Sequence, residues 1–486
     1  MNNNPQINRN VVASSLGWKM LERVFSQGGN FLVQVILARL LMPEEFGNLA
    51  IILAIVNYIS TFVQAGLSAA LIQKKNIDQL DVNTVFTITF IGNTFLYLGT
   101  FFSAPYIASF YNNAELTAPI RVTALALFLY GFNSIQVGLL SRNMDFRVIF
   151  FRSVIAVPVA GAIAIIMAYY GFGLWSLIAN LLISVLLSSI IMAVGTKTPV
   201  KFGFSLDRAK KIYSFSIKIL GASLISGFSD LFRTMSIGKK YTASELAFYD
   251  KAYSYSYLIL QVVNLSIQSV LFPVFSRKQD DIYKLKEMSR QSLRITMYGM
   301  FPILLGLFVA AKPAIVVLLT EKWLPCAPFL MIFCLFRISG CIVGIDRQVI
   351  MALGKSSVLF YFELIFLTAN IIMLLITIPI SVMAIAIGAI IVEYTVNIGM
   401  IMFCKRLYGY TLKERIKDLV NPFFNSCVMM AAMWGITLID MNMLYMLIFQ
   451  IIIGASVYMI MSKITKDSSY LYLVNFAKER FSKKIS

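Results

Sequence analysis

Residues 172–195 read FGLWSLIANLLISVLLSSIIMAVG and contain no charged side chain. About 20 consecutive apolar residues in a helix are enough to cross the hydrocarbon core of a bilayer. Comparable apolar runs recur from the N-terminal to the C-terminal part of the chain, separated by short polar segments. Because only helices and closed barrels satisfy their backbone groups in lipid, this pattern predicts an all-α protein that crosses the membrane many times.

The composition supports the same prediction. Of 486 residues, 59% are hydrophobic and 13% are charged, and the mean hydropathy is +0.78. Soluble domains carry roughly 45–50% apolar and about 25% charged residues, so the excess apolar surface requires lipid. The chain has no His, which excludes His-based acyl transfer, His-ligated zinc and His proton relays.

Fourteen apolar runs are long enough to span the membrane. The chain is therefore predicted to be an all-α polytopic membrane protein with about 14 transmembrane helices. Six spans form an N-terminal lobe (residues 1–200), six form a C-terminal lobe (201–405), and residues 406–486 hold two further spans and a basic amphipathic tail. The runs cover residues 15–41, 46–72, 82–111, 117–141, 149–170, 172–195, 212–238, 246–275, 292–319, 326–351, 358–378, 380–404, 421–440 and 443–461.

The basic residues alternate between loops in a way that sets the orientation. Most of the 42 Lys and Arg residues fall in every second loop, and such loops are cytoplasmic in membrane proteins. Both termini are therefore predicted to be cytoplasmic. The net charge of +19 then reflects topology and contact with anionic lipids, so no nucleic-acid partner is expected.

A weak internal repeat appears at an offset of 200 residues. Glu45 matches Glu245 and Ser26 matches Ser226, while Arg39 lies opposite Lys239. The offset aligns the first span with the seventh and the second with the eighth without a gap. Since six spans return the chain to its starting side, the halves are predicted to be parallel repeats, an architecture found in transporters.

Basic residues inside the predicted spans indicate a cationic cavity. An ionisable group in a span costs about 2.5–3.5 kcal/mol on insertion scales and seldom faces lipid. Arg and Lys are the side chains that bind phosphate and diphosphate. For Lys19 and Lys218, which lie near span ends, an alternative is that they reach the headgroups. The predicted substrate-binding residues are Lys19, Arg23, Lys218, Arg233 and Arg337.

Acidic residues in the spans allow ion coupling. The candidates are Glu22, Asp230, Glu363 and Glu393; for the last two, an interhelical hydrogen bond is an equally good interpretation. The five Cys residues have no CxxC spacing and are predicted to be packing residues. No metal site and no cofactor are expected. The Tyr-rich stretch around Tyr249 and Tyr253 could stack on sugars, but an aromatic belt is favoured.

Several motifs carry a family resemblance. They are Leu16-Gly17-Trp18-Lys19, the junction from Ala38-Arg39-Leu40-Leu41 to Pro43-Glu44-Glu45-Phe46-Gly47, and Gly66-Leu67. In these motifs and in its doubled six-span plan the chain resembles Wzx-type flippases of the colanic-acid exporter branch, within the multidrug/oligosaccharidyl-lipid/polysaccharide exporter superfamily. The resemblance extends over essentially the whole chain.

The resemblance implies a bacterial inner-membrane protein with two six-helix lobes arranged as a V. It implies a flippase that moves undecaprenyl-diphosphate-linked oligosaccharide from the cytoplasmic to the periplasmic leaflet by alternating access, for lipopolysaccharide, capsule or exopolysaccharide synthesis. In lipid-flipping relatives, basic residues of the first helix meet the diphosphate, and Lys19 and Arg23 occupy comparable places. Membrane lipids and the polysaccharide polymerase machinery are the other implied partners.

Two alternatives remain open at this point. A cation-coupled multidrug or small-molecule antiporter of the same fold would favour acidic cavity groups, whereas the deep charge here is at least as basic as acidic. A membrane-embedded glycosyltransferase or polymerase would carry catalytic carboxylates in larger external loops, but no predicted external loop exceeds about a dozen residues on the span lengths used here. The chain is therefore not expected to be an enzyme.

Overall fold

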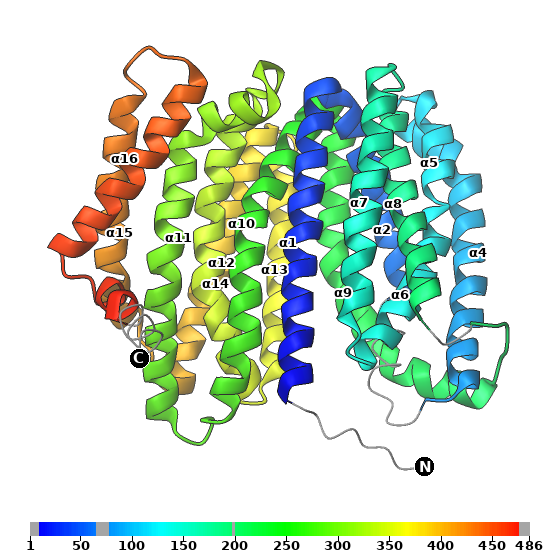
Figure 1. Ribbon diagram of the computed structural model, residues 1–486, viewed down its shortest axis with the longest axis horizontal. Helices are drawn as coiled ribbons and strands as arrows, with labels where there is room; N and C mark the ends of the chain where they lie inside the picture. The colour runs from blue at the N-terminus through cyan, green and yellow to red at the C-terminus, as the bar shows by residue number, and fades with distance from the viewer. Residues whose placement is uncertain (1–8, 65–76, 197–199, 476–486) are drawn as a thin grey trace. The chain divides into compact units, whose positions relative to one another are not determined.

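The computed structural model of the protein describes residues 9–64, 77–196 and 200–475, without the side chains of residues 9–16, 63, 211–216, 218–219, 222, 226 and 262–270. The described residues form helices and no strand. The chain divides into two compact units, Met1–Ala247 (unit 1) and Phe248–Ser486 (unit 2). The helices of each unit run side by side (Figure 1). The lobe limits at residues 200 and 405 stay predictions.

Unit 1 holds the helices up to the start of α10. In it, α1 packs along α7, α7 packs on α8, and α9 packs on α2. The helices are α1 (Arg9–Leu40), α2 (Pro43–Gln64), α4 (Gln79–Phe110), the 3-10 turn η1 (Ala114–Leu116), α5 (Thr117–Thr123), α6 (Ala126–Arg142), α7 (Phe146–Tyr169), α8 (Leu174–Gly195) and α9 (Leu206–Lys240).

Unit 2 is built around α11, which packs against α12, α15 and α16, while α14 packs between α12 and α13. Its helices are α10 (Ala243–Ser276), α11 (Ile282–Leu319), the 3-10 turn η2 (Glu321–Trp323), α12 (Cys326–Ala352), α13 (Ser356–Thr377), α14 (Val382–Tyr408), α15 (Leu412–Ile436) and α16 (Met443–Ile464). The first residues of α10 belong to unit 1.

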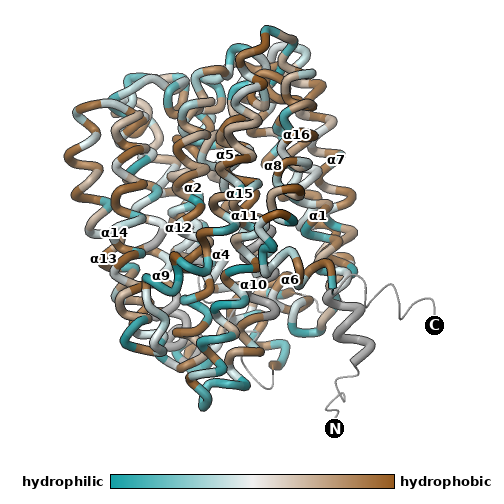
Figure 2. The backbone as a smooth tube through the Cα atoms, turned by 90° about the vertical axis from the view of Figure 1, so that its left-hand side faces the viewer, coloured by the Kyte–Doolittle hydropathy of each residue, from teal (hydrophilic) through white to brown (hydrophobic). Residues whose placement is uncertain are grey.

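Eleven helices in the described part of the chain are long and apolar enough to cross a membrane. Their surfaces carry many exposed large hydrophobic side chains, such as Tyr106 at 79% exposure and Val194 at 83%. Soluble proteins rarely expose so much apolar surface to water. Figure 2 shows long hydrophobic stretches, in brown, along the helices. The prediction of an all-α protein with many membrane spans is confirmed, whereas the number of fourteen spans stays a prediction.

The repeat at an offset of 200 residues is visible at two helix junctions. Helices α1 and α9 end at residues 40 and 240, and α2 and α10 begin at residues 43 and 243. In the first junction a Glu45 carboxylate oxygen accepts the backbone N–H of Met42 at 2.7 Å, and in the second Glu245 accepts that of Thr242 at 3.0 Å. The same capping contact thus starts both second helices, as the register of the repeat predicts.

Two predictions about side-chain packing have different outcomes. Cys326, Cys334, Cys341 and Cys404 are buried and unbridged, which confirms their interpretation as packing residues, whereas Cys427 is unbridged but only half-buried. The aromatic belt is wrong for Tyr249, which is 2% exposed and packs edge-on against Phe333 with 5.0 Å between ring centroids. A belt residue would instead face the membrane interface.

Candidate functional site

The acidic residue of α1 is held by α7. Ser153 donates its hydroxyl to Glu22 Oε1 at 2.9 Å, and Arg152 Nη2 lies 3.3 Å from the same oxygen. Sequence spacing suggests that Glu22 offsets the neighbouring charges of Lys19 and Arg23, because all three lie on one helical face. The structure instead directs this carboxylate to Arg152. The carboxylate is therefore not an ion-pair partner of the basic groups of α1.

Lys19 and Arg23 have few contacts. Lys19 is exposed, and its Nζ lies 5.5 Å from the centroid of the Phe146 ring. Arg23 is half-buried, and its buried Nε has no hydrogen-bond partner among the described residues. No described carboxylate forms an ion pair with either residue. This face of α1 is consequently a positively charged surface within unit 1.

The residues predicted on α9 form a local pair. Arg233 Nη1 lies 2.8 Å from Asp230 Oδ1, one helical turn earlier, and the Arg233 side chain is 16% exposed. Phe228, on the same helix, packs on Tyr58 of α2 with 6.3 Å between ring centroids. Lys218 also belongs to α9, but its side chain is outside the described residues.

Arg337 is the most deeply buried of the predicted basic residues. It lies near the middle of α12 and is 4% exposed. Its Nε donates to the Ser256 hydroxyl at 3.2 Å, and its Nη2 donates to the Tyr253 carbonyl at 3.1 Å. The rings of Tyr253 and Tyr257 lie 4.3 and 5.0 Å from the guanidinium carbon.

These partners of Arg337 are all uncharged. In the described part of the chain no carboxylate forms an ion pair with it. Hydrogen bonds and ring faces orient a guanidinium and lower the cost of its burial, but they do not neutralise it. Arg337 is therefore a fixed positive charge at the centre of a spanning helix.

The predicted acidic residues of unit 2 lie on the helices beside α12. Glu363 of α13 pairs with Arg347 of α12, with 2.5 Å between Oε1 and Nη1, and both side chains are about two-fifths exposed. Glu393 of α14 accepts a hydrogen bond from Asn397 at 2.9 Å, and Asn397 also donates to the Ser339 hydroxyl of α12 at 2.8 Å. Among the described residues Glu393 has no ion pair.

The structure therefore brings the predicted residues together in separate groups. Lys19, Glu22 and Arg23 lie on α1 and contact α7, and Asp230 and Arg233 lie on α9, all within unit 1. Arg337, Glu363 and Glu393 lie on the neighbouring helices α12, α13 and α14 of unit 2. A single cavity shared by all of them stays a prediction.

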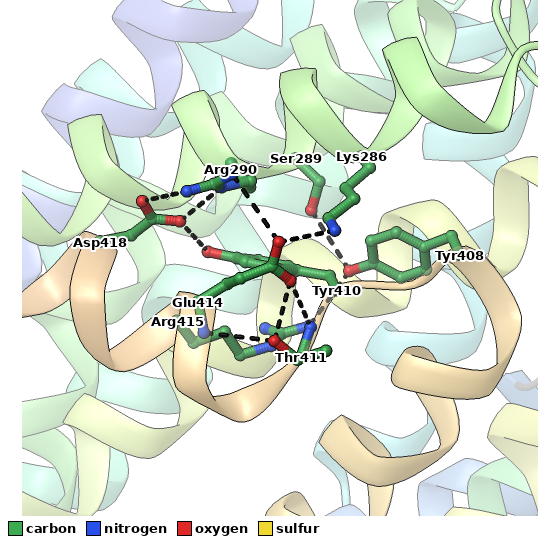
Figure 3. Close-up of polar contacts among 9 residues, drawn as sticks. All are labelled: Lys286, Ser289, Arg290, Tyr408, Tyr410, Thr411, Glu414, Arg415 and Asp418. Atoms are coloured by element: carbon green, nitrogen blue, oxygen red, sulfur yellow. Dashed lines mark hydrogen bonds and ion pairs between the residues drawn. The ribbon is translucent and has the colours of Figure 1, made fainter.

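A buried polar network that the sequence reasoning missed joins α12, α14 and α15. Asp346 is fully buried, and one of its oxygens accepts from the Tyr408 hydroxyl at 2.5 Å and from Arg415 Nη2 at 2.8 Å. The Tyr408 oxygen is also 3.3 Å from the Ser289 hydroxyl of α11. Figure 3 shows how Tyr408, Arg415 and Ser289 converge.

The network continues along α11 and α15. Arg290 makes a bidentate contact with Asp418, with both N–O distances at 2.8 Å, and the Tyr410 hydroxyl donates to the same carboxylate. Lys286 Nζ lies 2.7 Å from Glu414 Oε1 (Figure 3). Glu414 and Asp418 of α15 therefore each pair with a basic residue of α11, and these ion pairs connect the two helices.

The network was missed because its basic members were interpreted as cytoplasmic loop charges. Lys286, Arg290 and Arg415 all fall in loops whose basic residues set the predicted orientation. One signal was present in the sequence: Glu414 and Asp418 lie four residues apart, on one face of a helix in an otherwise basic stretch. Two acids in such a stretch indicate partners among the neighbouring bases.

Comparisons with known proteins agree with this architecture. The model of a family described as polysaccharide biosynthesis protein matches residues 36–328. The chain is 30% identical to the succinoglycan biosynthesis transport protein ExoT of Rhizobium meliloti, over 74% of this chain and 73% of that one. It is 23% identical to the lipopolysaccharide biosynthesis protein WzxC of Escherichia coli, over 73% of each.

Solved structures show the fold. The lipid II flippase MurJ, in its inward closed conformation, superposes with a TM-score of 0.78 at 16% identity, covering 94% of this chain and all of that one. An inward-facing multidrug resistance transporter of the MATE family gives a TM-score of 0.64 at 14% identity, covering 81% of this chain and 98% of that one. With a family match over more than half of its length and a relative at 30% identity, this chain is a multi-pass membrane protein that belongs to the polysaccharide biosynthesis protein family.

Proposed function

We propose that the protein is a flippase for lipid-linked oligosaccharides in the bacterial inner membrane, with both termini in the cytoplasm. It carries undecaprenyl-diphosphate-linked units from the cytoplasmic to the periplasmic leaflet, for lipopolysaccharide, capsule or exopolysaccharide synthesis. The family and the named transport functions of its relatives support this proposal. It acts as a transporter, not as an enzyme, and the polymerase that uses the exported unit is its downstream partner.

The observation that carries the proposal is that Arg337, although buried in a spanning helix, forms no ion pair with any described carboxylate. A lone guanidinium in a spanning helix costs about 2.5–3.5 kcal/mol on insertion scales, and uncharged partners recover only part of that cost. A diphosphate group supplies negative charge and acceptor oxygens that match a guanidinium fork. Arg337 is then the residue that binds the diphosphate most strongly.

Other basic residues guide the same head group. Lys19 and Arg23 on α1 have no described carboxylate partner, so they attract the diphosphate from the cytoplasmic side. Arg233 and Lys218 on α9 are the further basic residues of unit 1 that contribute. The polyprenyl tail is already soluble in hydrocarbon, so only the sugar and phosphate groups need a protected path through about 30 Å of lipid.

Glu393 is the strongest candidate for ion coupling. Glu22, Asp230 and Glu363 each pair with an arginine, whereas Glu393 is bonded to an amide. A carboxylate that forms no ion pair can take up and release a proton or a sodium ion as the cavity opens to each side. Replacing Glu393 with Gln should uncouple transport from the ion gradient.

The proposal is tested by Arg337→Ala in a strain that lacks the chromosomal gene. We expect surface polysaccharide to fall about a hundredfold, the scale of losing a charge-assisted contact in a buried site, while membrane abundance stays normal. Arg337→Lys should retain part of the activity. The matched control is Arg406→Ala, an exposed arginine at the end of α14. Normal polysaccharide from the Arg337→Ala strain would refute the assignment.

A further inference from the structure

A second polar site lies in unit 1, far along the sequence from the residues discussed above. The C-terminal half of α4 and the short helix α5 enclose a cavity of about 430 Å³ that is open to the surface. In Figure 1 these helices lie at the edge of unit 1. The polar and aromatic side chains in its wall are Tyr97, Phe101, Glu115, Thr117 and Arg121.

Arg121 is held so that half of its guanidinium remains available. Its Nε donates to the carbonyl oxygen of Phe101 at 3.1 Å, and its guanidinium carbon lies 4.2 Å from the centroid of the Phe101 ring. The Nη nitrogens have no partner among the described residues. These contacts fix the plane of the group and leave its two terminal donors for a ligand.

The second charge of the cavity has the opposite sign. Glu115 lines the same cavity and is exposed, yet it forms no ion pair with Arg121 or with any other described base. An ion pair between exposed side chains would contribute little, so both charges remain available to a ligand. Their separation suits a ligand that carries an anionic and a cationic group in one molecule.

The depth of the cavity indicates where such a ligand comes from. The 32 residues of α4 extend over about 48 Å, which exceeds the roughly 30 Å of the hydrocarbon core. Phe101 lies nine residues before the end of α4, about 14 Å along its axis. This is near the boundary between acyl chains and headgroups, on the side that the charge pattern assigns to the periplasm.

Helix α4 also carries an exposed apolar stripe, on a face beside the one that lines the cavity. Phe95, Leu98, Phe102 and Tyr106 are exposed and recur every three or four residues, so they form one stripe on the outer face of the helix. Such a stripe is suited to contact with acyl chains. Of the stripe, Phe95 and Leu98 precede Phe101 on α4 and lie nearer the bilayer centre, where they can contact the acyl chains of a phospholipid whose headgroup lies in the cavity.

We propose that this cavity binds a zwitterionic aminophospholipid of the outer leaflet, such as phosphatidylethanolamine. The phosphodiester accepts hydrogen bonds from the free donors of Arg121. The primary ammonium lies against Glu115 and the ring faces of Tyr97 and Phe101. A lipid without a cationic group satisfies only the first of these contacts, so the site selects phosphatidylethanolamine over phosphatidylglycerol.

The experiment is native mass spectrometry of the full-length protein in mild detergent with phosphatidylethanolamine or phosphatidylglycerol added. Wild-type protein should retain the first lipid more strongly. Arg121→Ala should weaken binding of both lipids about tenfold. Glu115→Gln should abolish the preference while phosphatidylglycerol binding persists. The matched control is Lys240→Ala, an exposed base at the end of α9 in the same unit, which should behave as wild type.

Three outcomes would overturn the proposal. The first is equal retention of the two lipids by wild-type protein, and the second is unchanged lipid binding by Arg121→Ala. The third is a loss of undecaprenyl diphosphate binding in Arg121→Ala while phosphatidylethanolamine binding persists, since the cavity would then serve the transported lipid. If Arg121→Ala does not fold, Glu115→Gln decides the question alone, because it changes selectivity and leaves the arginine in place.

Discussion

Helix α12 carries two buried polar sites of opposite character. Arg337, near the middle of the helix, is surrounded by a hydroxyl, a carbonyl and aromatic rings. Asp346, nine residues later and about 14 Å along the axis, pairs with Arg415 at 2.8 Å. The side chains of Asp346 and Arg415 are 0% and 3% exposed, and Arg337 is also buried, but only the second site contains an ion pair.

The comparison of these two sites distinguishes charges that stabilise the fold from charges that can bind a ligand. In a buried pair such as Asp346 and Arg415 each charge has a counter-charge, and breaking the pair is costly. A buried charge without a direct ion pair, such as Arg337, gains one when a ligand of opposite sign binds. The same contrast occurs on α1, where Glu22 pairs with Arg152 and Arg23 has no described partner.

The largest expected effect on stability comes from Arg415→Ala. Removing this side chain leaves Asp346 buried without a counter-charge, which should lower the free energy of unfolding by about 3–5 kcal/mol. Thermal unfolding of the purified protein in detergent measures the change. Lys417→Ala, an exposed base on the same helix, should leave the stability unchanged. A loss below about 1 kcal/mol, the level of surface pairs, would mean that the network does not hold α15.

A smaller effect is expected from Asp418→Asn. The change removes the charge from a bidentate contact with Arg290, whose side chain is 29% exposed and therefore partly solvated. We expect a loss of about 2 kcal/mol, typical of a hydrogen bond to a charged group. The same unfolding measurement applies. A larger loss in the free energy of unfolding for Asp418→Asn than for Arg415→Ala would contradict this ranking. Burial would then not determine which contact of the network contributes more to stability.

The smallest effect on stability is expected at the exposed start of α4. Here the informative result is whether the stabilising effect of Asp78 increases or decreases with pH. A hydrogen bond from Arg208, followed by one from the backbone N–H of Asp81, lowers the pKa of Asp78 from 3.8 to about 2. A lowered pKa means that this contact stabilises the folded protein above pH 3.8 and that its contribution disappears as the pH falls toward 2. The stability difference between wild type and Asp78→Asn should therefore vanish at the acidic end. A stability difference between the two proteins that increases as the pH is lowered would contradict this prediction.

The sequence was sufficient to predict features that depend on local composition. The apolar run at residues 326–351 coincides with α12, which covers Cys326–Ala352. The junctions beside Glu45 and Glu245 were located by the repeat. Helix length and apolar content are encoded in consecutive residues, so neither required knowledge of the tertiary structure.

Contacts between distant helices could not be predicted in this way. Lys286 and Glu414 pair across 128 positions of the chain, and nothing in their immediate neighbours indicates the partner. The rule that basic loops are cytoplasmic explains the side on which such residues lie, but not which of them fold back onto a helix. For the same reason the direction of Glu22 toward α7 became clear only from the packing of α1 on that helix.

The most direct test of the account measures the binding of undecaprenyl diphosphate to purified wild-type, Arg337→Ala and Arg406→Ala proteins. If Arg337 is a ligand-binding charge, Arg337→Ala should lose at least about tenfold in affinity without a decrease in melting temperature, and Arg406→Ala should match wild type. Unchanged affinity together with a large loss of stability in Arg337→Ala would show that this arginine is structural, like Arg415, and would contradict the account.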